Sequence, residues 1–295
     1  MNLPRNIIDE LIEKGLSQRF DNTFIYNDEK YYYYVNNYLF MTQIYRIYSL
    51  LAKELGVNTV EYDYIRKNGI NLLYSKSVYD KNEKLVESNY LNENAKKDGY
   101  SDYMKLWLEA IEELPFIDKD NSLDDFYKQW FYGLLIFDDD KQISLIRDNQ
   151  GLYRVGPYFD YGGVYMNQDV YDIDNDIFYD EETYLEFCNE SNYTREKLDK
   201  DLDMLIDKHV INDISWRYQN DKLLSEILPH LNDDFIERCF SINILDVMDK
   251  DVSHYYSPNF RKVVSLMFEM SRNLLKQKMT WVEANKNNRA NPKRF

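Results

Sequence analysis

Two groups of acidic residues lie close together in the sequence, separated by a short apolar segment. Asp138, Asp139 and Asp140 interrupt the stretch "LLIFDDDKQISLI", and Asp160 stands in "VGPYFDYGG", two residues before Gly162. Carboxylate oxygens are the ligands that Mg²⁺ prefers, and an Asp can also position a hydroxyl group for attack on a phosphate. These residue types are therefore suited to metal-assisted phosphoryl transfer. Each group also has a plainer interpretation: a solvated acidic turn for the first, and an Asp in a turn at a strand end for the second.

The elements before these groups form a strand-rich part of the chain. Aromatic and β-branched residues on both sides of Asn27-Asp28 and of Asn68-Gly69 predict two hairpins, because these dipeptides favour tight turns. Between the hairpins, apolar residues recur at three- and four-residue steps, which predicts a helix. The predicted elements are a short helix over residues 4–16 that stops near Gly15, a hairpin over 22–35, a helix over 38–56 and a hairpin over 59–79.

From about Ser101 onward the pattern becomes helical, with one hairpin over residues 141–163. These two parts predict an α+β chain, with a strand-rich lobe at 1–95 and a helical lobe at 96–295 that ends in a basic tail. An acidic loop is expected over residues 169–182. Helices are predicted over residues 101–114, 122–137, 183–189, 194–209, 218–229, 232–248 and 259–285.

Two segments carry a resemblance to a known family. The stretch "AKELGVNTVEYDYIRKNGINLLYSKSV", Ala52 to Val78, resembles the N-lobe segment of HipA-like kinases, in which a helix ends in Leu-Gly and a hairpin ends in a Ser-Lys-Ser-like turn. The stretch "DNQGLYRVGPYFDYGG", Asp148 to Gly163, resembles the metal-binding segment of the same family. The resemblance covers about residues 20–165 in order, and it implies a kinase-like two-lobed α+β fold with ATP and Mg²⁺ as cofactors.

The resemblance also implies roles for individual residues. Asp160 matches the Asp that holds the metal, and one of Asp138, Asp139 and Asp140 would position the attacking hydroxyl. Gln142 stands where an Asn metal ligand is expected, and a Gln is longer and fits a tight octahedral site poorly. The family's His is absent from this segment. Lys76 and Lys141 are the candidates for contacting the nucleotide's phosphates.

The sequence departs from the family at the position of the Lys–Glu ion pair that orients the nucleotide in kinases. The fifteen residues between Lys30 and Arg46 include no charged side chain. The resemblance places the Lys near residues 34–36 and the Glu near residues 43–46, and neither is present. The segment "RFDNTFIYNDEK" contains no Gly, so its backbone amides are poorly suited to wrapping phosphates. These departures predict a degenerate phosphotransfer site.

Composition and charge limit the classes of function. The chain has 295 residues, 44% of them hydrophobic, and a net charge of −16, which indicates an acidic globular protein. From Ser271 onward seven basic residues and one acidic residue leave a charge of +6, so the first 270 residues carry −22. A body this acidic repels nucleic-acid backbones, so we expect no nucleic-acid binding. The N-terminus does not resemble a signal peptide, and no apolar stretch is long enough to span a membrane, so we expect a cytoplasmic protein.

Other candidate sites have weak support. The stretch "DVYDIDNDIFYDEE" has acidic spacing similar to a calcium loop, but it has Ile177 in place of the Gly and Thr183 in place of the last Glu. The three His residues show no zinc spacing, and the two Cys residues lie 51 positions apart.

Three hypotheses remain open. The first is a HipA-like kinase fold with a degenerate site, acting as a pseudokinase or by binding a protein partner. The second is a divergent but active Ser/Thr protein kinase that uses ATP and Mg²⁺. The third is an acidic protein-interaction module of phage or mobile-element origin.

Overall fold

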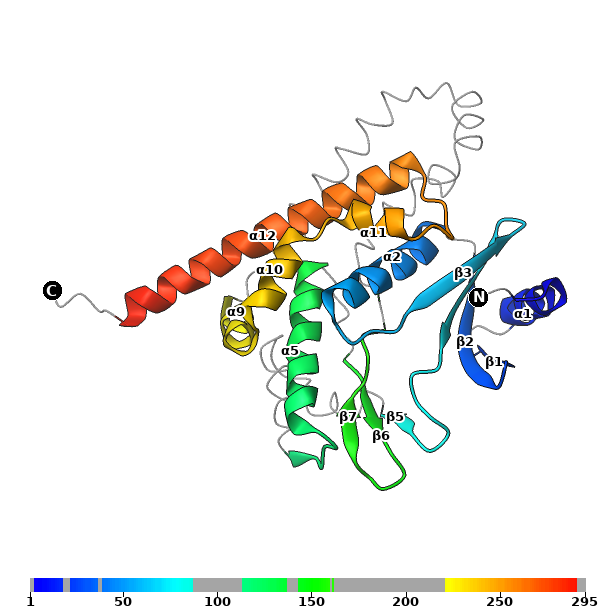
Figure 1. Ribbon diagram of the computed structural model, residues 1–295, viewed down its shortest axis with the longest axis horizontal. Coiled ribbons are helices and arrows are strands. Elements are labelled where there is room, and N and C mark those ends of the chain that lie inside the picture. The colour runs from blue at the N-terminus through cyan, green and yellow to red at the C-terminus, as the bar shows by residue number, and fades with distance from the viewer. Residues whose placement is uncertain are drawn as a thin grey trace.

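The computed structural model describes residues 3–17, 22–36, 39–86, 113–136, 143–159, 161 and 221–290. These residues form a four-stranded antiparallel sheet with a helix on each face, a three-stranded sheet, and a group of helices at the C-terminal end (Figure 1). Apart from Glu113 and Leu114, the described residues do not include the acidic loop or the helices predicted over 101–114, 183–189 and 194–209.

The first sheet is built from the two predicted hairpins. Its strands are β1 (Asn22–Tyr26), β2 (Glu29–Asn36), β3 (Tyr62–Lys67) and β4 (Ile70–Lys76), in the order β1-β2-β4-β3. The turn residues Asn27 and Asp28 have φ angles of 50° and 63°, and Asn68 and Gly69 have 51° and 76°. Both turns therefore use the left-handed conformation that Asn, Asp and Gly tolerate, as their sequences predict.

The two faces of this sheet are covered by different helices. Because side chains alternate along a strand, Tyr33 and Val35 of β2 lie on one face, where α1 (Arg5–Ser17) packs against them. On the opposite face, Leu73 and Tyr64 pack against Leu39 at the start of α2 (Leu39–Leu55). The helix α2 thus lies between the sheet and the rest of the molecule (Figure 1).

The helix α1 ends at Ser17, one residue beyond the predicted range of 4–16, so Gly15 lies inside the helix. Gly15 packs directly against β2, and a Cβ atom there would lie only 2.3 Å from Val35 Cγ2. The glycine is therefore present for close approach of the helix to the sheet rather than for helix termination.

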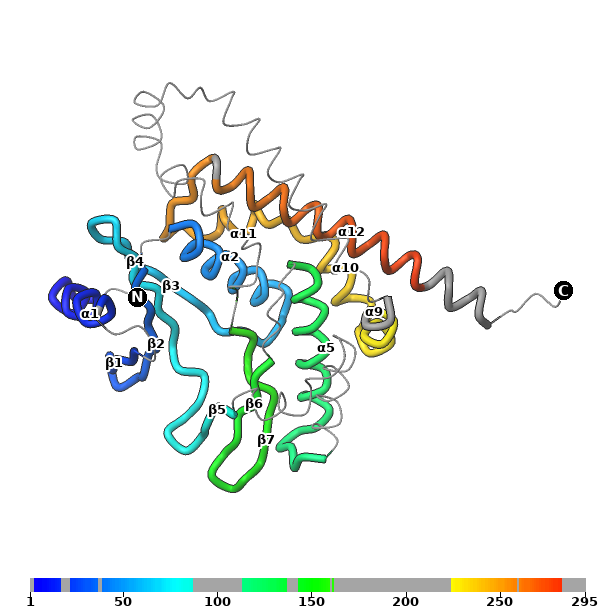
Figure 2. Tube along the Cα trace, turned by 180° about the vertical axis from the view of Figure 1, so that it is seen from behind, coloured from blue at the N-terminus to red at the C-terminus, as the bar shows by residue number. Residues whose placement is uncertain are grey.

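The second sheet carries the predicted hairpin at residues 141–163. Its strands are β5 (Lys84–Val86), β6 (Leu145–Arg147) and β7 (Tyr153–Val155), all antiparallel. The helix α5 (Lys119–Leu135) lies beside this hairpin, which is also visible from behind in Figure 2. The strand β5 was not predicted. It is only three residues long and mostly exposed, so its sequence shows no clear alternation of apolar and polar residues.

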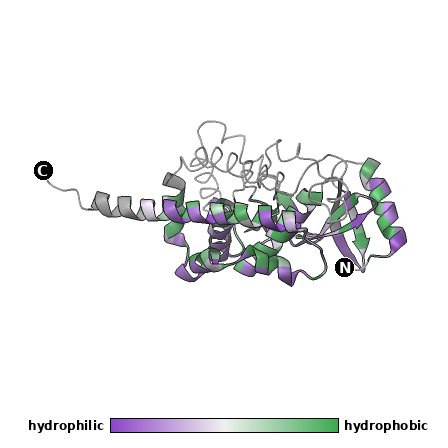
Figure 3. Ribbon diagram, turned by 90° about the horizontal axis from the view of Figure 1, so that it is seen from above, coloured by the Kyte–Doolittle hydropathy of each residue, from purple (hydrophilic) through white to green (hydrophobic). Residues whose placement is uncertain are grey.

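The C-terminal helices build the main hydrophobic core with α2 and α5. Helix α12 packs against α5, α9 and α11 and projects beyond the other elements (Figure 1), and hydrophobic and hydrophilic residues alternate along its coloured part (Figure 3). The single helix predicted over 232–248 is two helices, because Asn243 caps a new helix through its bond from Leu245 N. The elements are α9 (Asp221–Ile227), η2 (Leu228–His230), α10 (Asp233–Ser241), α11 (Ile244–Lys250) and α12 (Pro258–Ala290).

Candidate functional site

Most of the residues that the sequence singles out for chemistry lie outside the described part of the chain. Lys76 is the exception. The described residues also include both neighbours of Asp160 and the positions at which a kinase would carry its Lys–Glu pair. The residues outside are Asp138, Asp139, Asp140, Lys141, Gln142 and Asp160.

Lys76 lies at the end of β4, and its side chain is 61% exposed. Its Nζ forms an ion pair with Glu29 at the start of β2. Glu29 also accepts a hydrogen bond of 2.9 Å from the Tyr31 hydroxyl. The bond from Lys76, and to a lesser degree that from Tyr31, lowers the pKa of Glu29. Glu29 is therefore ionised and balances the positive charge of Lys76 at the surface.

The backbone before Asp160 is fixed against the connection between α2 and β3. Tyr158 forms a parallel bridge with Thr59, in which Val60 N donates to Tyr158 O at 2.8 Å and Tyr158 N donates to Asn58 O at 2.8 Å. The Tyr62 hydroxyl donates to Phe159 O at 2.6 Å. The peptide that leads into Asp160 is therefore held by three hydrogen bonds to a neighbouring segment.

The residue after Asp160 is held by the same segment. The Tyr161 hydroxyl is hydrogen-bonded to Thr59 Oγ1, and its ring is fully buried against Tyr158 and Tyr62. Both described neighbours of Asp160, Phe159 and Tyr161, are therefore anchored to the connection between α2 and β3.

Close packing beside the β6–β7 hairpin sets the direction of this segment. Gly156 N donates to Ser144 O at 2.7 Å, and Gln129 Nε2 on α5 donates to Gly156 O at 2.8 Å. A Cβ atom at position 156 would lie 2.1 Å from Ser144 Oγ. The glycine of "VGPYFD" is thus needed for the close approach of the segments before and after the hairpin.

The strand position expected to carry the kinase Lys is occupied by uncharged residues. In protein kinases this Lys lies on a strand that precedes the helix carrying its Glu partner. Here β2 precedes α2, and its last residues are Tyr34, Val35 and Asn36. Tyr34 is 52% exposed, whereas Asn36 is buried and accepts hydrogen bonds from Thr42 Oγ1 at 3.1 Å and Asn71 Nδ2 at 3.3 Å.

The helix position expected to carry the Glu is occupied by residues that donate hydrogen bonds. Gln43 Nε2 donates to Tyr255 O at 2.9 Å, and one turn later Arg46 binds both carboxylate oxygens of Asp251 at 3.0 Å. Arg46 Nη1 also donates to Tyr62 O at 2.6 Å. The charge at this place on α2 is therefore opposite to that of a kinase.

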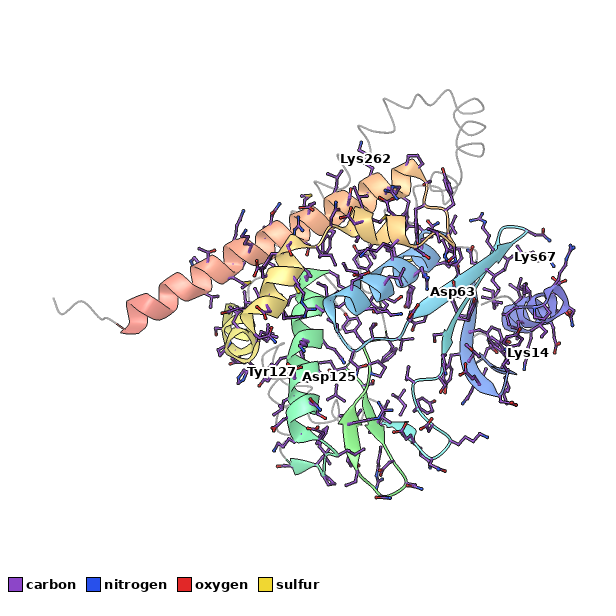
Figure 4. All side chains as sticks on the ribbon, in the orientation of Figure 1. Lys14, Asp63, Lys67, Asp125, Tyr127 and Lys262 are labelled. Atoms are coloured by element: carbon purple, nitrogen blue, oxygen red, sulfur yellow. The ribbon has the colours of Figure 1, made fainter. Side chains whose placement is uncertain are left out.

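Arg46 belongs to a buried network of two positive and two negative groups. His254 lies between Asp251, at 3.2 Å from its Nδ1, and Asp63 of β3, at 3.1 Å from its Nε2 (Asp63 is labelled in Figure 4). Burial alone would lower the pKa of His254, but the hydrogen bonds to Asp251 and Asp63 raise it to about 9. Burial would raise the pKa of the Asp63 carboxyl, but hydrogen bonds from His254 and Tyr74 hold that pKa well below the usual range. Burial would likewise raise the pKa of Asp251, but hydrogen bonds from His254 and Arg46 hold it well below the usual range.

One feature of the sequence points to this network. Arg46 is a single charged residue among the buried apolar residues of α2, and an ionisable side chain in such a position needs a partner. The partner could not be identified, because Asp251 lies 205 residues further along the chain.

The linker between the two sheets, residues 77–83, is attached to both of them. Arg154 of β7 binds Glu83 through two hydrogen bonds of 3.1 Å and 2.9 Å and donates to Val78 O at 3.0 Å. On the other side, the Tyr79 hydroxyl is hydrogen-bonded to the Tyr32 hydroxyl of β2. The linker therefore has side-chain contacts to each sheet.

The described residues contain neither a group of metal-ligating side chains nor a membrane-spanning helix. No three His, Cys, Asp or Glu side chains in that part of the chain are grouped so that they could hold a metal ion. Within the same residues, no helix has the length and apolar character needed to cross a membrane.

Comparison with known proteins identifies the fold. No protein-family model matches the sequence, and a search of curated proteins found no match. Among solved structures, the chain is similar to the proinflammatory kinase CtkA of Helicobacter pylori, with a TM-score of 0.52 and 14% identity over 90% of this chain and 97% of that one. The chain has a HipA-like kinase fold.

A second solved structure supports the same fold. HipA from the Shewanella oneidensis MR-1 toxin–antitoxin system, in a complex with HipB and operator DNA, matches with a TM-score of 0.51 and 14% identity. The match covers 89% of this chain and 64% of that chain. The resemblance inferred from Ala52–Val78 and Asp148–Gly163 is thus confirmed for the fold.

Proposed function

We propose that this kinase-fold protein does not transfer phosphoryl groups and acts by binding a protein partner. The observation that carries this proposal is Arg46 on α2, where the kinase arrangement requires a Glu. Its guanidinium is bound to both oxygens of Asp251, and the side chain is only 10% exposed. Arg46 is therefore committed to a structural contact.

The strand next to α2 supports the same proposal. With Tyr34, Val35 and Asn36 at its end, β2 offers no cation to the phosphates of a nucleotide. The nearest Lys of that strand, Lys30, lies at the other end, where its Nζ is 4.9 Å from the centre of the Tyr32 ring. Its distance along the strand is about 13 Å from position 34, at about 3.3 Å per residue.

The proposed partner is a basic protein. The first 270 residues carry a charge of −22, which favours association with positively charged surfaces and disfavours anionic substrates. This part of the proposal shares its physical basis with the hypothesis of an acidic interaction module.

A divergent active kinase is the second candidate, and one observation favours it. The backbone on both sides of Asp160 is firmly anchored by Thr59, Val60 and Tyr62, as a metal-binding carboxylate would need. In that case Asp160 and Gln142 would hold Mg²⁺, one of the three Asp residues at 138–140 would position the hydroxyl, and Lys76 or Lys141 would contact phosphate.

Nucleotide binding and phosphate transfer distinguish the two candidates. We expect no rise in Tm with millimolar ATP and Mg²⁺, and no incorporation of labelled phosphate into the protein or into a basic model substrate. A surviving site whose Kd lies hundredfold below the ATP concentration would stabilise the fold by about 2.7 kcal/mol. Phosphate incorporation that disappears in Asp160→Ala would overturn the proposal in favour of the active kinase.

A further inference from the structure

Helix α2 is joined to the segment between α11 and α12 at two successive turns. Gln43 donates to Tyr255 O at 2.9 Å, and Arg46 donates to Asp251 through two bonds of 3.0 Å. Arg46 also reaches Tyr62 O at the start of β3. One guanidinium group therefore connects three elements: α2, the sheet and the C-terminal helices.

The groups around this contact complete a closed network. Asp251 and Asp63 balance the charges of Arg46 and His254, and hydroxyl groups occupy the remaining carboxylate positions. Tyr256 donates to Asp251 at 2.7 Å, and Tyr74 of β4 donates to Asp63 at 2.7 Å. The charged and titratable groups that face His254 and Arg46 are Asp251, Asp63, Glu61, Tyr64, Tyr74 and Tyr256.

In an active kinase the corresponding helix is positioned by its Glu, through a Lys that also contacts the nucleotide's phosphates. The placement of that helix therefore depends on the nucleotide site. Here the same face of α2 is bound to Asp251, which belongs to the C-terminal part of the chain.

We propose that the Arg46–Asp251 pair is a latch that fixes α2 between the sheet and the α11–α12 segment without any contribution from a nucleotide. This inference deepens the proposed function. It rests on that function in one respect, namely that the position of α2 does not depend on a bound nucleotide. The latch would hold α2 in place where the residues expected to form a Lys–Glu pair carry no such charges. Helix, sheet and C-terminal segment then form one preassembled surface on which a partner can bind.

Burial determines how strong such a latch is. The side chains of Arg46 and Asp251 are only 10% and 2% exposed. Removing one partner of a buried, hydrogen-bonded ion pair leaves an uncompensated charge, which is far more costly than removing an exposed pair. The chain provides a matched comparison in the neighbouring ion pair between Lys250, the last residue of α11, and Glu54 of α2, which is 3.0 Å long with side chains that are 64% and 42% exposed.

Hydrogen exchange of the α2 backbone amides tests the latch on the full chain. We expect Arg46→Met and Asp251→Asn each to reduce the protection of α2 by at least about tenfold, and the double variant to be no worse than the more damaging single one. Lys250→Met should change the protection by less than about twofold. Equal protection in wild type and in both single variants, or full additivity in the double variant, would overturn the latch.

Two further measurements complete the test. Arg46→Lys serves if Arg46→Met does not fold. It keeps the charge but loses the bidentate contact with Asp251, so it should fold and show an intermediate loss of protection. ATP with Mg²⁺ should leave the protection of α2 in the wild type unchanged. Added protection by ATP would contradict the proposed function and the nucleotide independence, whereas the variants alone decide whether the ion pair holds the helix.

Discussion

At the scale of single residues, His254 is the group whose charge the structure controls most directly. It is held between two carboxylates, and its ring lies 4.3 Å from that of Tyr64. The sequence drew attention to the His residues only as zinc ligands and found no suitable spacing. The spacing of the His residues in the sequence could not reveal this ion network, because its members come from α2, β3 and the α11–α12 segment, which are far apart in the chain.

The raised pKa of His254 predicts a loss of stability at alkaline pH. Its folded pKa of about 9 lies above the ordinary value of 6.5, so the protonated His254 stabilises the fold fully below pH 6.5. This contribution is lost as the pH rises through 9, and it amounts to about 3 kcal/mol at 1.36 kcal/mol per pKa unit. Urea unfolding between neutral pH and pH 10 measures it.

His254→Gln should be less stable than the wild type at pH 6 and should lose most of the pH dependence between 6.5 and 9. The matched control is His230→Gln, because His230 is exposed and stacks on Tyr127 with ring centres 4.2 Å apart. This control should keep the alkaline loss of stability. An unchanged pH profile in His254→Gln would show that another group titrates.

At the scale of elements, local patterns predicted the sheet well. Asn27-Asp28 and Asn68-Gly69 identified both hairpins, because the turn conformation depends on these residues alone. The continuous helix predicted over 232–248 was wrong, whereas α1 ends within one residue of its predicted range, although Gly15 does not terminate it. Gly15 is determined by its contact with Val35 on a strand twenty residues away, and the break before α11 depends on a cap at Asn243 that a run of apolar residues conceals.

The candidate site was predictable only in part. The metal-binding role of Asp160 stays a prediction, because Asp160 lies outside the described residues, although Tyr158, Phe159 and Tyr161 beside it are held by hydrogen bonds. The absence of a Lys–Glu pair could be read from the uncharged run between Lys30 and Arg46. The use of Arg46 could not be predicted, because its partner depends on how the C-terminal helices pack.

The close packing of α1 predicts a specific mutational effect. In Gly15→Ala the new methyl group would gain about 1 kcal/mol of helix propensity. It would also press on the Val35 side chain, which is stiff and buried, and such overpacking costs about 1–3 kcal/mol. We expect a net loss of stability in urea unfolding.

A second substitution separates the clash from other effects. Val35→Ala removes the nearest methyl group but leaves Val35 Cβ and the Tyr33 ring at 3.0 Å and 3.2 Å from the new Cβ atom, so adding Gly15→Ala to this variant should cost clearly less stability than it does in the wild type. If Gly15→Ala is equally harmful in both backgrounds, its effect does not come from the contact between α1 and β2.

At the scale of the whole molecule, charge is the dominant feature. The body is strongly acidic, whereas the residues from Ser271 onward carry +6, and five of the seven basic residues in this part of the chain lie within α12. Like charges distributed over the body repel one another and destabilise the compact state. The charges of Arg46 and His254 are matched by those of Asp251 and Asp63, so these four groups add no net charge that could offset this repulsion.

Stability should therefore rise with salt in the low-salt range. Between about 0.01 M and about 0.15 M NaCl the screening length falls from about 30 Å to about 8 Å, which removes most of the repulsion between distant exposed charges. We expect the midpoint of urea unfolding to increase over this range and then to level off. Specific ion effects on hydrophobic burial would instead continue to grow at higher salt, so the shape of the curve identifies the cause. A midpoint that falls over the low-salt range would mean that exposed ion pairs such as Lys250–Glu54 outweigh the net repulsion of the acidic body.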